Sequence, residues 1–497
     1  MQDKATFQSH KVLFFNTLAF TLCFAAWMIN GVLVTFLVNT GVFDWSSIQI
    51  GWLLGVPVLV GALLRLPVGL LTDRFGGKPV MIFILLSSAL PLYLLSQANS
   101  YSSFLLLSFW FGLAGSSFAA GVANTSLWYP KSLQGTAMGI FGAGNAGAAL
   151  TSMLAPSILQ RLTMQGTNLE GWRSLPQLYA GVLVAMAVLY FFGTKNKRPE
   201  GGKTLTERLK PLKEVRVWRF GLYYFFVFGG FVALAQWLIP YYVNVYSMSI
   251  VSAGFMATIF SLPAGVIRAV GGWLADRVGA RMVLLWVFGV SIVCLFFLFV
   301  PRMEIQAPGQ GVMAARPGKV TSVMPEEIRV GEDAYPLLSA SGDSSHVSIR
   351  FGIHQDQEQF LLLPTASFLQ VPVVQAGDEV VKGQLLAKGV TNIYFQANRF
   401  IFTVFLLIIG IMMGFGSAAV FKHISDYYPA SVGSVGGIVG VLGGLGGFFY
   451  PIIFGYLLKA TGVWTTCWMF LALIAAICVV LQRLAVRAII RKAQEST

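Results

Sequence analysis

The chain is dominated by long apolar runs that alternate with short polar connections. A helix needs roughly 20 apolar residues to cross a hydrocarbon core of about 30 Å. Runs of about this length lie near residues 12–38, 47–70, 79–97, 102–127, 132–160, 176–193, 217–245, 250–272, 282–301, 399–421, 433–458 and 466–483. The pattern predicts an all-α membrane protein with twelve transmembrane helices.

One interval, residues 302–398, departs from this pattern. It contains proline, glycine, acidic residues and short runs typical of β-strands, including HVSIRFGI at 346–353 and FLLLPTASFLQVPVVQ at 360–375. We therefore expect a small all-β domain inserted between the ninth and tenth spans.

Two further segments of this interval, GKVTSVM and AGDEVVKGQLLAKG, resemble half-motifs of biotinyl/lipoyl-type β-sandwich modules. Those carriers have a modified lysine at a hairpin tip, typically flanked by methionine, and neither Lys382 nor Lys388 has such a neighbour. We expect no attached lipoyl or biotin group and no other cofactor. The insert is expected either to dock an extracytoplasmic partner or shield a gate, or to have no separate function.

Composition supports the membrane assignment. Of the 497 residues, 56% are hydrophobic and 11% are charged, with a mean hydropathy of +0.72. Soluble globular domains contain about 25% charged residues, so this chain cannot cover a water-facing surface of normal composition. The same values exclude intrinsic disorder, because disordered chains have low hydrophobicity and high charge.

The formal net charge is +14, which in a soluble protein would suggest nucleic-acid binding. Here the basic residues lie between apolar runs, so we expect no nucleic-acid partner. Positively charged loops remain in the cytoplasm, which places both termini there and the insert outside. The basic residues of the connections after even-numbered spans and of the tail are Arg74, Lys78, Lys195, Lys197, Arg198, Lys203, Arg208, Lys210, Lys213, Arg277, Arg281, Arg487, Arg491 and Lys492.

The sequence also contains a parallel internal repeat. RLPVGLLTDRFGGK at 65–78 matches RAVGGWLADRVGAR at 268–281, and WYPKSLQGTAMG at 128–139 matches YYPASVGSVGG at 427–437. The shift between the matched positions grows by almost the length of the insert. We therefore expect two six-helix halves, residues 1–194 and residues 217–301 with 399–497, joined by a cytoplasmic linker at 195–216.

The repeated loop motif resembles that of the major facilitator superfamily. The segment 111–150 is similar to the fourth and fifth helices of its nitrate/nitrite porter family, and GSVGGIVGVLGGLGGFFYP at 433–451 is similar to that family's eleventh. The resemblance implies a multi-pass transporter of the bacterial inner membrane that binds nitrate and nitrite, is surrounded by lipid, and is a monomer. The residues of the gating loop motif are Gly69, Asp73, Arg74, Gly76, Lys78, Gly272, Asp276, Arg277 and Gly279.

The Asp–Arg pairs of this motif are expected to form a charge latch across the cytoplasmic helix ends. Alternatively, they serve only as a basic topology signal. Glycine is concentrated in the predicted fifth and eleventh spans, where missing side chains allow close helix approach. We expect these two helices to form the interface on which the halves rock.

Arg65 and Arg268 occupy equivalent positions about two helical turns inside the loop motif, in otherwise apolar spans. No acidic residue lies near mid-membrane to neutralise them, and a buried charge there is costly. Each arginine either snorkels or bonds to carbonyl groups of its own half, or both face the seam and bind a small anion. A planar guanidinium suits a planar oxyanion, which favours the second interpretation.

The family resemblance also implies supporting residues in the binding site. Asn145 would donate its amide hydrogens to the anion, Tyr224 would donate its hydroxyl, and Phe118 and Phe228 would sandwich a flat ligand. Helix packing is the alternative role for each of them. Gly440 lies where a small hydroxyl residue is expected in some members, so that contact is in doubt.

The expected function is nitrate/nitrite antiport, with nitrate/proton symport or an anion-sensing receptor as alternatives. Antiport is favoured because intramembrane proton carriers are usually Asp, Glu or His. Of the four histidines, two lie in the insert, one lies in the N-terminal tail, and His423 lies at a predicted helix end. No nucleophile–base pair, phosphate loop or metal cluster is found, so we expect neither an enzyme nor a metal site.

Overall fold

The computed structural model describes residues 6–130, 133–198, 210–299, 302–306, 310–338, 365–394, 399–428 and 432–495. Contacts divide the chain into two compact units, residues 1–295 with 406–497 and residues 296–405. Residues 199–209 of the expected linker, the run 346–353 and residues 360–364 lie outside the described part of the chain.

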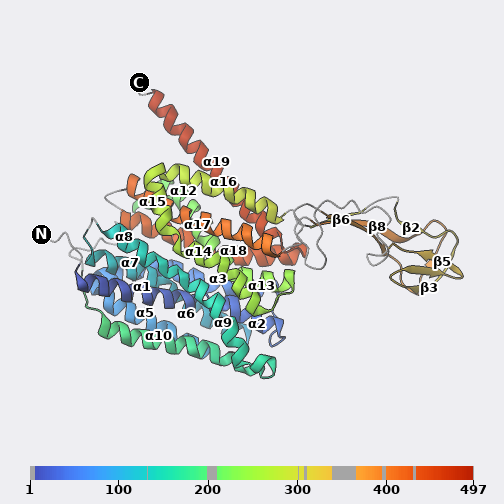
Figure 1. Cartoon of the computed structure of the whole chain (residues 1–497), viewed down its shortest axis with the longest axis horizontal. Coiled ribbons are helices and arrows are strands. Elements are labelled where there is room, and N and C mark those ends of the chain that lie inside the picture. Colours follow the sequence, from blue (N-terminus) through green and yellow to red (C-terminus); the bar gives the residue numbers. More distant parts are fainter. Residues whose placement is uncertain are drawn as a thin grey trace. The chain divides into compact units, whose positions relative to one another are not determined.

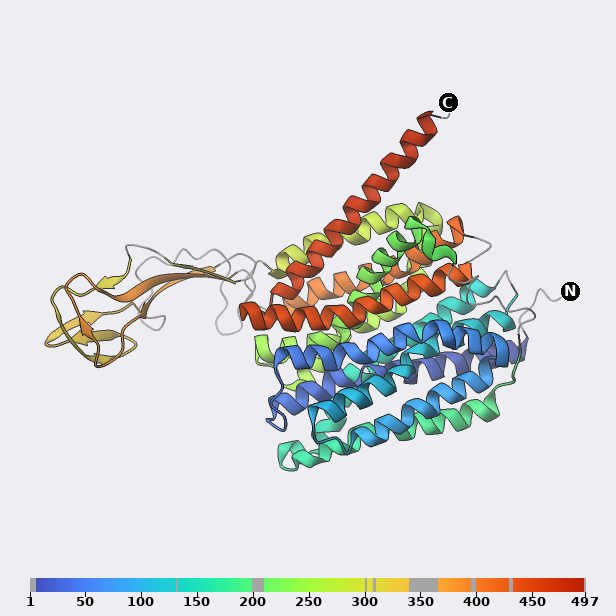
Figure 2. The same cartoon turned by 180° about the vertical axis from the view of Figure 1, so that it is seen from behind.

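The first unit is a helical bundle in which residues 7–193 form one group of helices and the later helices form a second group beside it (Figure 1 and Figure 2). Elements of the first group are α1 (Phe7–Trp27), α2 (Ile29–Asn39), α3 (Ser47–Leu63), α4 (Arg65–Phe75), α5 (Gly77–Leu95), α6 (Tyr101–Phe111), η1 (Gly112–Ser116), α7 (Ser117–Trp128), α8 (Gln134–Gly142), η2 (Ala143–Ala146), α9 (Gly147–Leu162), η3 (Met164–Gly166), η4 (Leu169–Arg173) and α10 (Ser174–Gly193).

The second group contains a π-helical turn, η6, within its first long helix. Its elements are η5 (Lys210–Lys213), α12 (Val215–Tyr224), η6 (Phe225–Gly229), α13 (Gly230–Tyr246), α14 (Ile250–Val266), α15 (Arg268–Val278), α16 (Ala280–Phe299), α17 (Arg399–Tyr427), α18 (Val432–Thr461) and α19 (Thr466–Glu495).

Ten helices within the described residues are long and apolar enough to cross a membrane, and α14 with α15 adds an eleventh if this pair, bent by 51°, is one span. The protein is thus a mostly helical multi-pass membrane protein, and the prediction of twelve spans is not confirmed. The expected fifth span is helical but divided, because η2 separates α8 from α9.

The repeated motif takes the same local structure in both groups of helices. Arg65 and Arg268 each begin an eleven-residue helix after a one-residue break, and these helices end at Gly76 and Gly279. The two glycines have φ of +88° and +90°, a conformation that side chains with a Cβ rarely adopt. The sequence repeat is therefore also a structural repeat.

The two groups pack along helix pairs that are far apart in the sequence. α18 packs along α3, and α14 packs along α9. The end of α3 that is remote from the loop motif is in close contact with α18, since a Cβ built at Gly51 would lie 2.5 Å from the Pro451 oxygen. The Ser47 hydroxyl donates to the Gly455 oxygen at 3.1 Å in the same region.

A proline in α3 explains part of the buried polar contacts nearby. Pro57 has no N–H, so the Leu53 oxygen four residues earlier loses its helical partner. Asn30 Nδ2 donates to that oxygen at 2.7 Å, and Trp27 Nε1 donates to the Pro57 oxygen at 2.8 Å. These two side chains anchor α3 within its own half.

The second unit contains eight described strands in two four-stranded sheets: β1 (Arg302–Gln306), β2 (Val312–Met313), β3 (Gly318–Val323), β4 (Glu327–Val330), β5 (Asp333–Pro336), β6 (Thr365–Pro372), β7 (Glu379–Val380) and β8 (Leu385–Tyr394). β8 pairs with β1, β2 and β6, and the other sheet has the order β5-β4-β3-β7. Val320, Ile328 and Leu386 are buried in its core. A small β region is therefore present where the sequence predicted one.

Candidate functional site

Arg65 is buried between aromatic rings at the seam of the two groups of helices. It is 5% exposed, and its guanidinium carbon lies 5.3 Å from the Phe118 ring centroid and 5.0 Å from that of Phe228. Its Nη1 donates to the Gly440 oxygen of α18 at 2.8 Å. Arg65 therefore bonds across the seam, and neither snorkels nor bonds to a carbonyl group of its own half.

Arg268 is half-buried and approaches the same aromatic ring from the other half. Its guanidinium carbon lies 5.4 Å from the Phe228 centroid. Among the described residues, its Nε and the Nε of Arg65 are buried without a hydrogen-bond partner. Both arginines thus keep donors that a ligand could use.

The shared contact with Phe228 limits the distance between the two charges. The guanidinium carbons lie 5.0 and 5.4 Å from one centroid, so they are at most 10.4 Å apart. No described salt bridge includes either arginine. At an effective dielectric constant of about 20, two such charges repel by at least about 1.6 kcal/mol, and an anion between them would offset this repulsion.

A π-helical turn positions Tyr224 and Phe228. The η6 turn begins directly after Tyr224 and contains Phe228, and the two rings stack with centroids 5.0 Å apart and an interplanar angle of 5°. Single π-turns within helices occur frequently at functional sites. The Tyr224 hydroxyl is buried without a hydrogen-bond partner in the described part of the chain, so it can donate to an anion.

Asn145 is connected to this cluster through its neighbour in η2. A Cβ at Gly144 would lie 2.4 Å from the Phe20 ring, and Phe20 contacts Phe118 with centroids 5.4 Å apart. Asn145 is fully buried and its Nδ2 donates to the Gly142 oxygen at 2.7 Å. One of its two amide hydrogens is therefore used within its own turn, and the other remains available.

Sequence reasoning named Gly440 but missed the role of its backbone oxygen, and it missed the contacts of Phe421 and Gly443 with Tyr224. The Gly440 oxygen accepts a hydrogen bond from Arg65. Phe421 packs edge-on against Tyr224 with ring centroids 5.3 Å apart, and a Cβ at Gly443 would lie 2.1 Å from Tyr224. A backbone oxygen has no sequence signature. The concentration of glycine in α18 was the available signal for the close approach of Tyr224.

The loop motifs lie at the helix ends beyond the arginine pair. Asp276 forms a salt bridge at 3.1 Å with Lys422 of α17, a partner that sequence reasoning missed. The guanidinium groups of Arg277 and Arg74 instead lie 4.4 Å from the Trp273 ring and 5.3 Å from the Phe75 ring.

In the first half, residues that follow α10 hold the loop motif. Asn196 Nδ2 donates to the Phe75 oxygen at 2.9 Å, and its Oδ1 accepts from Lys78 N at 3.3 Å. The Lys78 ammonium donates to the Thr194 oxygen at 2.9 Å. Gly69 is buried within α4, whereas a Cβ at Gly272 of α15 would meet no atom within 4 Å.

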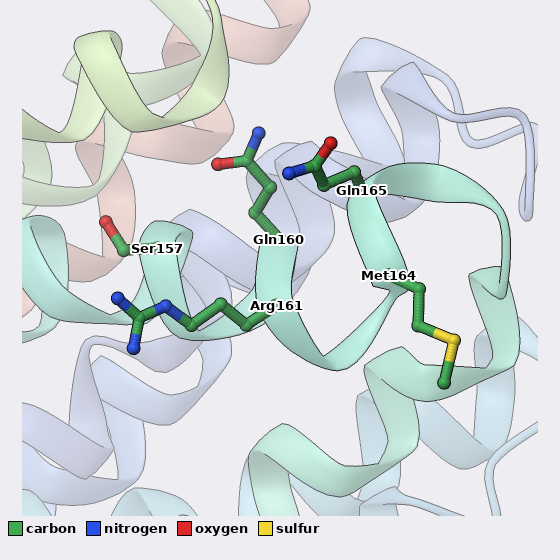
Figure 3. Close-up of a pocket in the computed structure, with 5 residues that line it drawn as sticks. All are labelled: Ser157, Gln160, Arg161, Met164 and Gln165. Carbon is green, nitrogen blue, oxygen red and sulfur yellow. The ribbon is translucent and has the colours of Figure 1, made fainter.

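A separate polar hollow opens at the far end of α9 and is lined by Ser157, Gln160, Arg161, Met164 and Gln165 (Figure 3). Arg161 follows Asn145 by sixteen residues, which is about 24 Å along a helix. This hollow is therefore distinct from the arginine pair.

Comparisons with known proteins agree on one family. A family model described as Major Facilitator Superfamily matches residues 16–313. The chain is 36% identical over 473 residues to the "Probable nitrate/nitrite antiporter NarK1" of Thermus thermophilus, covering 94% of this chain and 89% of that protein. It is 29% identical to the "Nitrite extrusion protein" of Bacillus subtilis over 63% of this chain and 77% of that one.

The fold also resembles solved structures at low identity. A bacterial homologue of the human lysosomal transporter Spinster, crystallised in an inward-facing and occupied conformation, has a TM-score of 0.64 at 13% identity. The match covers 97% of this chain and 98% of that one. At this identity the likeness concerns the fold alone.

Proposed function

Because this chain belongs to the major facilitator superfamily, we propose that it is a secondary transporter of nitrate and nitrite that works by alternating access. The names of its relatives support this substrate class. The observation that carries the proposal is that two arginines, one from each half, contact the same aromatic ring, that of Phe228.

The geometry of the site fits a flat monovalent anion. Each guanidinium offers planar, paired N–H donors, and hydrogen bonds between charged groups are stronger than neutral ones. Phe118 and Phe228 supply flat apolar surfaces beside these donors. Tyr224 and Asn145 add neutral donors, so the ligand is held in the plane of the two arginines.

The coupling proposed is exchange of nitrate for nitrite. The repulsion of about 1.6 kcal/mol derived above corresponds to roughly a fifteenfold bias against bringing the two halves together around an empty site. A bound anion removes that bias and allows the site to reorient in either direction. Reorientation of the empty site is therefore disfavoured, so that one anion tends to enter as another leaves.

The membrane arrangement that goes with this function follows the charge pattern. The halves are residues 1–194 and residues 217–301 with 399–497, the linker at 195–216 and both termini are cytoplasmic, and the protein is a monomer of the bacterial inner membrane. The β insert at 302–398, with its likeness to biotinyl/lipoyl modules, lies outside the cytoplasm, where it is available to a partner.

Counterflow in proteoliposomes tests the proposal. Vesicles loaded with unlabelled nitrite or nitrate should accumulate labelled nitrate with the parent protein. Arg65→Lys and Arg268→Lys keep the charge but lose the planar, paired N–H donors of the guanidinium. Each should therefore lower uptake by about 10- to 100-fold, the equivalent of one charged hydrogen bond. Arg487→Lys, on an exposed site of α19, is the matched control and should leave uptake unchanged.

Other outcomes would replace the mechanism. Rapid uptake into anion-free vesicles driven by an inward proton gradient would establish symport instead of exchange. Saturable nitrate binding without flux would identify a sensor. Full activity of both lysine variants would show that the arginine forks do not bind the anion.

A further inference from the structure

A second basic hollow lies where α12, α16, α17 and α19 meet, beside the loop motif of the second half. Arg219, Arg281, His423, Tyr427 and Gln482 line it, and its cavity volume is about 20 Å³. That is room for roughly one water molecule, so a larger ligand has to sit at its open mouth. His423 is 6% exposed and stacks on Phe220 with centroids 5.3 Å apart. These four helices all belong to one half, so this hollow is not part of the seam that contains Arg65.

Two arginines lie against one aromatic ring at this hollow, and a third arginine lines it. The guanidinium carbons of Arg216 and Arg281 lie 4.5 Å and 6.0 Å from the centroid of Tyr427, and Arg281 also donates to the Tyr427 hydroxyl. Arg219 lines the same hollow. No salt bridge among the residues that the structure describes includes Arg216, Arg219 or Arg281.

The carboxylates on neighbouring turns are bound to other groups. Asp426 and Asp276 each lie 3.1 Å from the Lys422 ammonium, and Glu214 accepts from the Tyr428 hydroxyl at 2.5 Å. Burial and the contact with Glu214 raise the pKa of Tyr428 to about 12, so the tyrosine remains a donor at neutral pH. Among the described residues, the three arginines therefore have no carboxylate bound to them, although Asp426 also lies near enough to act on His423.

Gln482 adds a second requirement on the ligand. Its Nε2 donates to the Arg281 oxygen at 2.6 Å, which fixes the orientation of the amide. Its Oε1 is buried and, among the described residues, has no donor. A buried acceptor without a partner is costly, so the best ligand brings a hydrogen-bond donor together with its negative charge.

The hollow also lies close to the membrane–water boundary. Val215 and Trp218 at the start of α12 are 83% and 52% exposed, and tryptophan is enriched where helices leave the hydrocarbon core. Basic pockets between transmembrane helices on the cytoplasmic side bind anionic lipid headgroups. The ligand chemistry that fits is thus a phosphate diester next to a hydroxyl.

We propose that this hollow binds the headgroup of an anionic phospholipid, with its phosphate against Arg219 and Arg281 and a headgroup hydroxyl donating to Gln482. The lipid neutralises the end of the second half that carries Asp276 and Arg277. This is a site for membrane lipid, separate from the transported anion.

Lipid binding to the full-length protein in neutral detergent tests this proposal. Phosphatidylglycerol carries both the phosphate and the hydroxyls, and its binding is measured by native mass spectrometry together with the rise in thermal unfolding temperature. Arg219→Gln combined with Arg281→Gln should lower its apparent affinity by at least about tenfold, since charged hydrogen bonds are lost. Arg483→Gln combined with Arg487→Gln removes equal charge from exposed positions of α19 and should change it less than twofold.

Comparison ligands separate the possible sources of the phosphate. Phosphatidylcholine, which has no net charge and no headgroup donor, should neither bind the hollow nor stabilise the protein. Equal stabilisation by inorganic phosphate would assign the hollow to a soluble anion and overturn the lipid proposal. An equal loss of affinity for phosphatidylglycerol in the two double variants would also overturn it, because general surface charge would then explain binding. If the first double variant does not fold, each single arginine variant gives the same comparison.

Discussion

Replacing Gly51 by alanine should shift the protein away from the state in which α3 is closed against α18. A Cβ at this position would lie 2.5 Å from the Pro451 oxygen and 3.0 Å from Ile452 Cα. Both are backbone atoms, which cannot rotate away as a side-chain end can. Because α3 and α18 belong to different halves, the overlap exists only while the halves are closed at this end. The substitution therefore penalises one conformation and spares the fold of each half.

The size of the shift follows from the cost of overpacking. One methylene too many in a packed interior costs about 1–3 kcal/mol, and each 1.4 kcal/mol is tenfold in an equilibrium constant. The population of the closed state relative to the open one should fall by about 5- to 150-fold. Gly289→Ala in α16 is the matched control, because a Cβ there would meet no atom within 4 Å.

A cysteine at Ser47 reports this equilibrium. The Ser47 hydroxyl donates to the Gly455 oxygen at 3.1 Å, so Ser47→Cys should be covered in the closed state and reactive in the open one. The native cysteines are buried, and the parent without Ser47→Cys gives their background labelling. A membrane-impermeant maleimide should react faster when Gly51→Ala is added. Unchanged labelling, or an equal increase with Gly289→Ala, would refute the reasoning.

Three further substitutions probe other parts of the chain. Tyr190→Phe removes the hydroxyl that donates to the buried Asn16 Oδ1, which still accepts from Asn124 Nδ2. It should lower stability by about 0.5–1.5 kcal/mol, measured by thermal unfolding in detergent, with transport per folded molecule unchanged. Phe228→Leu removes the ring shared by both arginines and should weaken nitrate binding by about 5- to 30-fold, at about 0.5–1 kcal/mol per cation–π contact; a titration that matches the parent would contradict this. Asp276→Asn breaks the salt bridge to Lys422. Because both side chains are substantially exposed, the free energy of unfolding should change by less than about 1 kcal/mol.

The apolar pattern predicted a mostly helical membrane protein but not the breaks in its helices. Runs of about 20 apolar residues mark a span whether or not the helix is continuous. η2 interrupts the fifth run at Ala143–Ala146, and a one-residue break precedes Arg268 in the eighth. These breaks depend on where glycine and neighbouring helices permit a tighter or bent turn, which single-sequence hydropathy does not encode.

The repeat located the arginine pair because a costly charge at equivalent positions is a strong local signal. It did not reveal how Arg65 is held, since the Gly440 oxygen is a backbone group. The glycines also divide into two kinds, those that pack across the seam and those that pack within their own half. Gly444 of α18 would place a Cβ 2.5 Å from Ala62 across the seam, whereas Gly147 would place one 2.2 Å from the Thr21 oxygen of its own half. Composition identifies close packing, but only the fold shows which helix is approached.

The different surroundings of the two arginines suggest how anion binding affects the seam. Arg65 contacts two rings and bonds to the Gly440 oxygen of the opposite half. For Arg268 the described residues provide the Phe228 ring and no hydrogen bond. An anion that draws Arg65 donors away from Gly440 weakens a tie between the halves, and at the same time it attracts Arg268 toward the seam. In the proposed mechanism the same ligand thus loosens one link between the halves and forms another. A transporter needs such a balance, because a site that only tightened on binding would hold its anion and stop.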